Sequence, residues 1–196
     1  MKNKTLGISA LVGAPFLCIG YLVESTWSQY QDSSFTGVWG LLYITGWMCT
    51  MIVYQRSGIT GNDRFGRIII WVILITLLLA NLSNLVQLIV PTEKPGWFFY
   101  LDLCWPLSNV LMLPLGIAVI RARKVNGWKR YWPLVTGFWF PMSILALILF
   151  GKNEATMIVG GIYSLGAWSL LAYSCFEIAN PEPPATPLNK VMITVS

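Results

Sequence analysis

The feature that most constrains this chain is a series of six apolar stretches, each long enough to cross a membrane. A helix needs about 20 mostly apolar residues to span the hydrocarbon core. The six stretches cover residues 6–23, 37–54, 68–90, 97–120, 131–150 and 156–176. Strands of a membrane barrel would alternate polar with apolar residues, and the apolar run at 68–75 does not alternate. The sequence therefore predicts an all-α integral membrane protein built as a six-transmembrane-helix bundle.

The composition agrees with lipid as the solvent of these helices. Of the 196 residues, 56% are hydrophobic and 11% are charged, whereas soluble domains carry about 25% charged residues.

Lys2 and Lys4 before the first stretch also resemble the start of a signal peptide. Phe16 and Leu17 are too large for the cleavage site that would follow, so we expect this stretch to remain as a spanning helix. One membrane domain, 1–178, and a Pro-rich tail, 179–196, complete the chain.

The distribution of basic residues predicts the orientation. Short cytoplasmic loops carry an excess of Lys and Arg. The loops between the first and second, third and fourth, and fifth and sixth stretches lie on one side of the membrane. Of the 13 basic residues, only Lys94 and Lys152 fall in these loops. The other eleven lie in the two tails and in the loops at 55–67 and 121–130. We therefore expect both termini to be cytoplasmic, and a bacterial cytoplasmic membrane is the location that these compact loops favour.

Prolines in the fourth and fifth stretches predict kinked helices. A proline inside a helix has no N–H to donate to the carbonyl four residues before it. Pro106 leaves the carbonyl of Asp102 free in this way, and Pro114 and Pro141 do the same further along the chain. Irregular backbone at membrane depth is tolerated where it lines a cavity, as in transporters. The kink at Pro106 would therefore place a carboxyl group and a free carbonyl together.

Polar side chains in the third and fourth stretches predict a pocket. Polar residues within a membrane span are costly and often mark functional sites. In the third stretch, Asn81, Asn84 and Gln87 follow one another at three-residue intervals, and in the fourth, Asp102 is the one clearly intramembrane acid. The short connection at 91–96 makes these helices antiparallel neighbours, so the two polar groups can meet near the outer surface. The predicted ligand-binding residues are Asp102, Asn81, Asn84, Gln87, Asn109, Ser108, Trp105, Tyr100 and Glu24.

Three functions fit this pattern. The first is binding or transport of a small ligand, proton or cation in an outward-facing pocket, with Asp102 as the charge partner. The second is a structural or accessory subunit, in which the polar residues are only interhelical hydrogen-bond glue and the surface meets a homo-oligomer or another membrane protein. The third is a lipid-modifying enzyme, which needs a second catalytic group within reach of Asp102.

Absent residue types exclude several other functions. The chain contains no histidine, so histidine-ligated haem and Ser–His catalysis are excluded, and the four cysteines form no CxxC pair that suggests zinc. We predict no catalytic residue, no metal and no cofactor.

The net charge of +5 does not indicate nucleic acid, because the basic residues lie in short runs between apolar stretches rather than in one stripe. Membrane lipids are the remaining partner.

Overall fold

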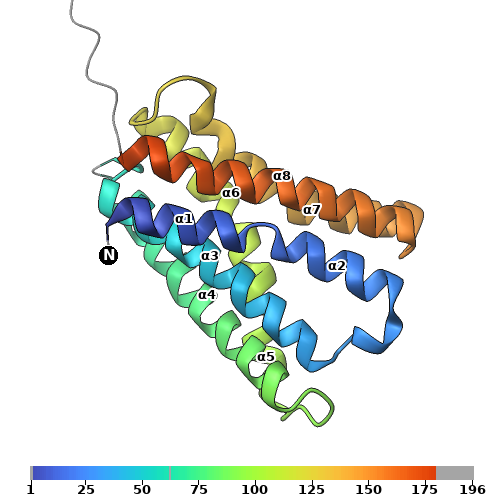
Figure 1. Ribbon diagram of the computed structural model, residues 1–196. Coiled ribbons are helices and arrows are strands. Elements are labelled where there is room, and N and C mark those ends of the chain that lie inside the picture. Colours follow the sequence, from blue (N-terminus) through green and yellow to red (C-terminus); the bar gives the residue numbers. More distant parts are fainter. Residues whose placement is uncertain (1, 62, 180–196) are drawn as a thin grey trace, which may run out of the picture.

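The computed structural model describes residues 2–61 and 63–179, and the regular secondary structure in them is all helical (Figure 1). Six segments are long and apolar enough to cross a membrane, and their ends lie within four residues of the predicted ones. They are Asn3–Thr26, Ser34–Ser57, Arg64–Ile89, Phe98–Ala122, Gly127–Phe150 and Glu154–Phe176. The prediction of an all-α chain with six such helices is confirmed. Its insertion and orientation in a membrane stay predictions, and the Pro-rich tail lies outside the described residues apart from its first one.

The described residues form eight α-helices and two short 3-10 helices, one of which, η1, lies between the first two segments. They are α1 Asn3–Gly13, α2 Phe16–Thr26, η1 Ser28–Tyr30, α3 Ser34–Ser57, α4 Arg64–Ile89, α5 Phe98–Asp102, α6 Cys104–Ala122, η2 Gly127–Tyr131, α7 Trp132–Phe150 and α8 Glu154–Ala179. The beginning of α1 and the end of α8 lie at the same end of the bundle (Figure 1), as an even number of crossings requires.

Two of the six segments are interrupted. The first was predicted as a single helix, but Pro15 separates α1 from α2, because its ring removes one backbone donor and opposes regular helix. The fourth breaks at Leu103, between α5 and α6, three residues before Pro106. Pro114 and Pro141 lie inside the continuous helices α6 and α7. The bends expected at these two prolines stay predictions.

Close backbone contact between α1 and α3 holds the first two segments together. A Cβ added at Gly13 would lie 2.7 Å from the carbonyl oxygen of Leu42 and 2.8 Å from the Cα of Gly46. Small residues permit this approach between membrane helices. Ser33 caps the beginning of α3, where its Oγ accepts a hydrogen bond from the Phe35 amide. Gly58, with a φ of 58°, caps the end of the same helix.

The core of the bundle is rich in aromatic side chains. Trp168 of α8 packs edge-on against Trp47 of α3 and Trp139 of α7, with ring centroids 5.4 Å apart in both pairs. Tyr43 packs against the same Trp168 ring at 5.4 Å. Edge-to-face pairs of this kind are favourable beyond the area they bury. This aromatic core includes Tyr43, which also lines a cavity between the helices.

Candidate functional site

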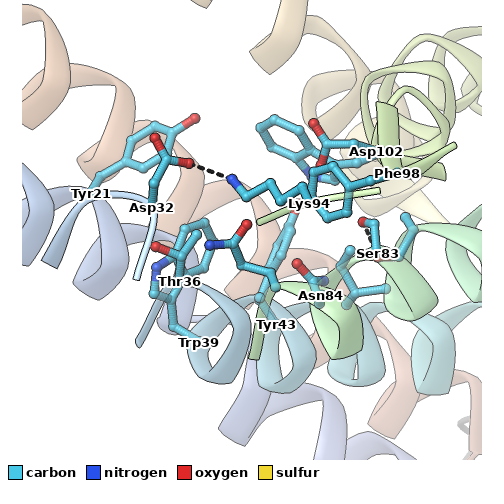
Figure 2. A pocket seen from close by; sticks show the side chains of 15 residues that line it. Tyr21, Asp32, Thr36, Trp39, Tyr43, Ser83, Asn84, Lys94, Phe98 and Asp102 are labelled. Atoms are coloured by element: carbon cyan, nitrogen blue, oxygen red, sulfur yellow. Dashed lines mark hydrogen bonds and ion pairs between the residues drawn. The ribbon is translucent and has the colours of Figure 1, made fainter. Parts of the chain in front are cut away.

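A cavity of about 210 Å³ opens between α2, α3, α4 and the first turns of the fourth segment (Figure 2). It lies at the end of the bundle that carries the α2–α3, α4–α5 and α7–α8 connections. This end, which we call the acidic end, holds five acidic residues against two basic ones: Glu24, Asp32, Glu93, Asp102 and Glu154 against Lys94 and Lys152. The cavity wall contains five aromatic rings, those of Tyr21, Trp39, Tyr43, Phe98 and Trp105.

Two adjoining helix faces line the cavity. The helix α4 contributes Ala80, Ser83, Asn84 and Gln87, which follow the i, i+3, i+4, i+7 spacing of one helical face. The helix α3 contributes Thr36, Trp39, Gly40 and Tyr43 at the same spacing. The two faces meet closely, since a Cβ at Gly40 would collide with the side-chain amide of Asn84. The absence of a side chain at Gly40 therefore allows α3 to approach Asn84 of α4.

Four of the predicted site residues do come together. Asn84 and Gln87 line the cavity from α4, and Asp102 and Trp105 line it from α5 and α6. Gln87 is buried, and its Nε2 donates to the Ser33 carbonyl at 3.2 Å, which fixes α4 to the start of α3. The antiparallel arrangement of the third and fourth segments is the reason why these residues meet.

Asn81 is not part of the cavity wall. Its Nδ2 donates to Thr45 Oγ1 at 3.0 Å, so it joins α4 to α3 on another side. Successive helical residues are rotated by about 100°, so each three-residue step falls about 60° short of a full turn. Asn81, Asn84 and Gln87 therefore spiral around α4 instead of sharing one face, and the first of them turns away from the cavity.

Ser108 and Asn109 lie below the cavity and are packed. Both are fully buried. Ser108 Oγ lies 2.8 Å from Thr76 Oγ1 and donates to the Cys104 carbonyl at 2.7 Å, and Asn109 Nδ2 donates to the Trp105 carbonyl at 3.0 Å. These contacts join α6 to α4 or stay within α6, and neither residue lines the cavity.

Tyr100 and Glu24 also lie outside the cavity wall. Tyr100 is 71% exposed and points away from the bundle. Glu24 lies behind the wall, where its Oε1 accepts hydrogen bonds from Thr36 Oγ1 at 2.6 Å and from Trp39 Nε1 at 2.9 Å. It also lines a smaller cavity of about 130 Å³ on the other side of Thr36. Glu24 thus holds two wall residues in place.

An ion pair crosses the mouth of the cavity. Lys94 Nζ, from the α4–α5 connection, lies 2.8 Å from Asp32 Oδ1, from the α2–α3 connection (Figure 2). The same ammonium lies 5.1 Å from the centroid of the Phe98 ring. Asp102 lies close enough to interact with both members of the pair, but its carboxylate has no hydrogen bond or ion pair within the described part of the chain. One carboxylate at the mouth is therefore neutralised and the other is free.

Three polar groups of the cavity wall are buried without a hydrogen-bond partner in the described structure. They are the Tyr43 hydroxyl, Asn84 Nδ2 and Trp105 Nε1. The sequence-based prediction missed Tyr43, because an aromatic residue is ordinary in an apolar helix and only the contact between α3 and α4 places it at the cavity. It also missed Lys94 and Asp32 as a pair, because no sequence pattern connects two loops.

Two further comparisons complete the description of the site. Among residues 2–61 and 63–179, no group of three or more His, Cys, Asp or Glu side chains could hold a metal ion. Comparison with protein-family models, with curated proteins and with solved structures finds no match.

Proposed function

We propose that this multi-pass membrane protein binds a small organic cation in an outward-facing cavity at its acidic end. The observation that carries the proposal is the free carboxylate of Asp102 beside a wall of five aromatic rings. Aromatic faces attract cations through their negative quadrupole, and cages of such rings recognise quaternary ammonium groups. A carboxylate beside the cage adds the opposite charge.

The Lys94 side chain supports the same preference from within the chain. Its ammonium group lies between the Asp32 carboxylate and the face of Phe98, so the mouth of the cavity already accommodates one tethered cation. A free ligand would use the second carboxylate, that of Asp102, together with the remaining rings. The excess of acidic residues at this end of the bundle would also attract cations from solution.

The cavity volume limits the size of the ligand. An apolar cavity of about 150 Å³ holds a benzene molecule, so about 210 Å³ suits a cation of comparable or slightly larger size. A trimethylammonium group with a short chain fits this limit. A lipid with two acyl chains does not fit, which weighs against the lipid-modifying enzyme.

Transport is the form of binding that the backbone favours. Interrupted helices are found at the binding sites of transporters, typically near the bilayer midplane. Here the first and fourth segments are both interrupted, and Asp102 is the last residue before the second interruption. The strong asymmetry of basic residues supports a bacterial cytoplasmic membrane with this cavity facing outward.

The proposal is tested by the thermal stability of purified protein with and without n-butyltrimethylammonium chloride, against sodium chloride at equal ionic strength. A ligand that binds only the folded state stabilises it by about 2.7 kcal/mol at a concentration of 100 Kd. We expect wild type to gain several degrees in Tm and Asp102→Asn to gain little. The matched control is Glu93→Gln, at an acidic residue of the same end that does not line the cavity. It should behave as wild type, and equal shifts in all three proteins would contradict the proposal.

A further inference from the structure

The hydrogen-bonding groups of the cavity wall divide into two sets. Most are already engaged: Ser83 donates to the Ala80 carbonyl, Gln87 to the Ser33 carbonyl, and Thr36 and Trp39 to Glu24. The Tyr43 hydroxyl, Asn84 Nδ2 and Trp105 Nε1 are not engaged within the described structure. Because nearly all buried polar groups in proteins are hydrogen-bonded, these exceptions require an explanation.

The three unengaged groups lie together at one part of the wall. Tyr43 is only 1% exposed, and Figure 2 shows its ring rising from α3 toward Lys94, with Asn84 beside it. The Trp105 ring approaches from α6, and its N–H lies near the Tyr43 hydroxyl without reaching hydrogen-bond geometry. Groups from three different helices therefore converge on the inner side of the cavity.

All three groups can donate a hydrogen bond, and the Trp105 N–H can only donate. A cationic group has no acceptor to offer them, so the cation bound at Asp102 leaves these donors unsatisfied. An anionic group is disfavoured, because Asp32 and Asp102 lie at the same cavity and like charges repel. The group that fits the donors is an uncharged acceptor.

We infer that the ligand carries an uncharged hydrogen-bond acceptor, such as an ether, hydroxyl or carbonyl oxygen, besides its cationic group. The acceptor oxygen, which has at most two lone pairs, accepts hydrogen bonds from among the three donors of Tyr43, Asn84 and Trp105, while the cation is bound at Asp102 nearer the mouth. This inference rests on the proposed function, since it assigns the other end of the same ligand. It makes the cavity selective between cations of equal charge and size.

The test compares two probes that differ in one group. n-Butyltrimethylammonium and (2-methoxyethyl)trimethylammonium have the same charge and nearly the same shape, but an ether oxygen replaces one methylene in the second. Their affinities are measured by isothermal titration calorimetry on purified full-length protein. We expect wild type to bind the ether about five times more tightly, as one additional hydrogen bond allows.

Variants assign this preference to the donors. Tyr43→Phe removes one hydroxyl and Trp105→Phe removes one N–H, and each should lower the affinity ratio of the two probes toward one. The matched control is Tyr54→Phe, which removes a hydroxyl from an equally buried tyrosine of the same helix far from the cavity. It should keep the wild-type ratio, and melting without probe verifies that each variant is folded.

The possible results separate this inference from the proposed function. If wild type binds both probes equally, or prefers the butyl compound, the acceptor site is wrong while cation binding stands. If the ratio persists in Tyr43→Phe and Trp105→Phe, the preference arises elsewhere and the inference is again overturned. If wild type binds neither probe, the proposed function fails, and the inference fails with it.

Discussion

Tyr43 and Tyr54 lie on the same helix and have opposite environments. Eleven residues separate them, about three turns of α3, so they point to nearly the same side. Both are 1% exposed. The Tyr54 hydroxyl lies 2.7 Å from Ser174 Oγ of α8, which itself donates to the Leu171 carbonyl at 2.6 Å. The Tyr43 hydroxyl has no partner within the described residues and lies at a cavity.

The two tyrosines show that one buried polar group can stabilise the fold while another is available to a ligand. Around Tyr54, the polar side chains of neighbouring helices satisfy one another. The Ser108–Thr76 pair between α6 and α4 is arranged in the same way. Around Tyr43, donors from three helices converge but do not pair. Unpartnered buried groups also occur away from the cavity, for example Asn109 Oδ1 and Trp168 Nε1. A missing partner therefore indicates a binding site only where the group also lines a cavity.

The largest effect on stability is expected at the contact of α1 with α3, beside Tyr43. Gly13→Ala places its Cβ within 2.8 Å of backbone atoms of Leu42 and Gly46, which cannot move away as a side chain can. We expect a loss of about 3 kcal/mol in unfolding free energy. The control is Gly166→Ala in α8, where no atom lies within 4 Å of the new Cβ. Denaturant unfolding in detergent measures both, and equal stability would show that α3 is not fixed in this way.

A smaller effect should distinguish the two tyrosines directly. Tyr54→Phe removes an interhelical hydrogen bond, which costs about 1 kcal/mol. Tyr43→Phe removes a hydroxyl that has no partner, so its unfolding free energy should change by less than about 0.5 kcal/mol or rise slightly. The same unfolding assay compares them. A loss in Tyr43→Phe as large as in Tyr54→Phe would break the comparison, since Tyr43 would then contribute to the fold.

The smallest effect on stability is expected at the mouth of the cavity. Lys94→Gln breaks the ion pair with Asp32, whose side chain is 82% exposed. Such exposed pairs contribute between zero and about 1 kcal/mol, so we expect a change in Tm near the limit of detection. Affinity for n-butyltrimethylammonium should instead rise a few-fold, because a competing cation is removed. Unchanged or weaker binding by calorimetry would show that Lys94 does not compete at the mouth.

The six segments could be predicted from the sequence because length and apolar composition nearly determine a membrane helix. The same reasoning found Asn84, Gln87, Asp102 and Trp105, since a short connection makes the third and fourth segments antiparallel neighbours. It also included Ser108, which at 1.5 Å per residue lies about 9 Å along the helix from Asp102 and does not line the cavity. It also overlooked Pro15 as an interruption of the first segment.

The remaining wall residues could not be singled out from their residue types alone. Tyr43 and Trp39 are ordinary aromatic residues for a membrane helix, and only the contact between α3 and α4 shows which of them face a cavity. Asp32 and Lys94 belong to separate connections, 62 residues apart in sequence. Which loop side chains pair depends on how the helices that carry them are packed, and local patterns contain no information on this.

If a small organic cation binds beside Asp102, its position can be measured directly. Crystals grown with tetramethylarsonium, an arsenic-containing quaternary cation, would reveal the ligand by its anomalous diffraction. We expect an arsenic peak inside the cavity, between the Asp102 carboxylate and the aromatic rings that include Trp39 and Trp105. Arsenic peaks confined to other surfaces of the protein, or no peak in the cavity at saturating concentration, would contradict it.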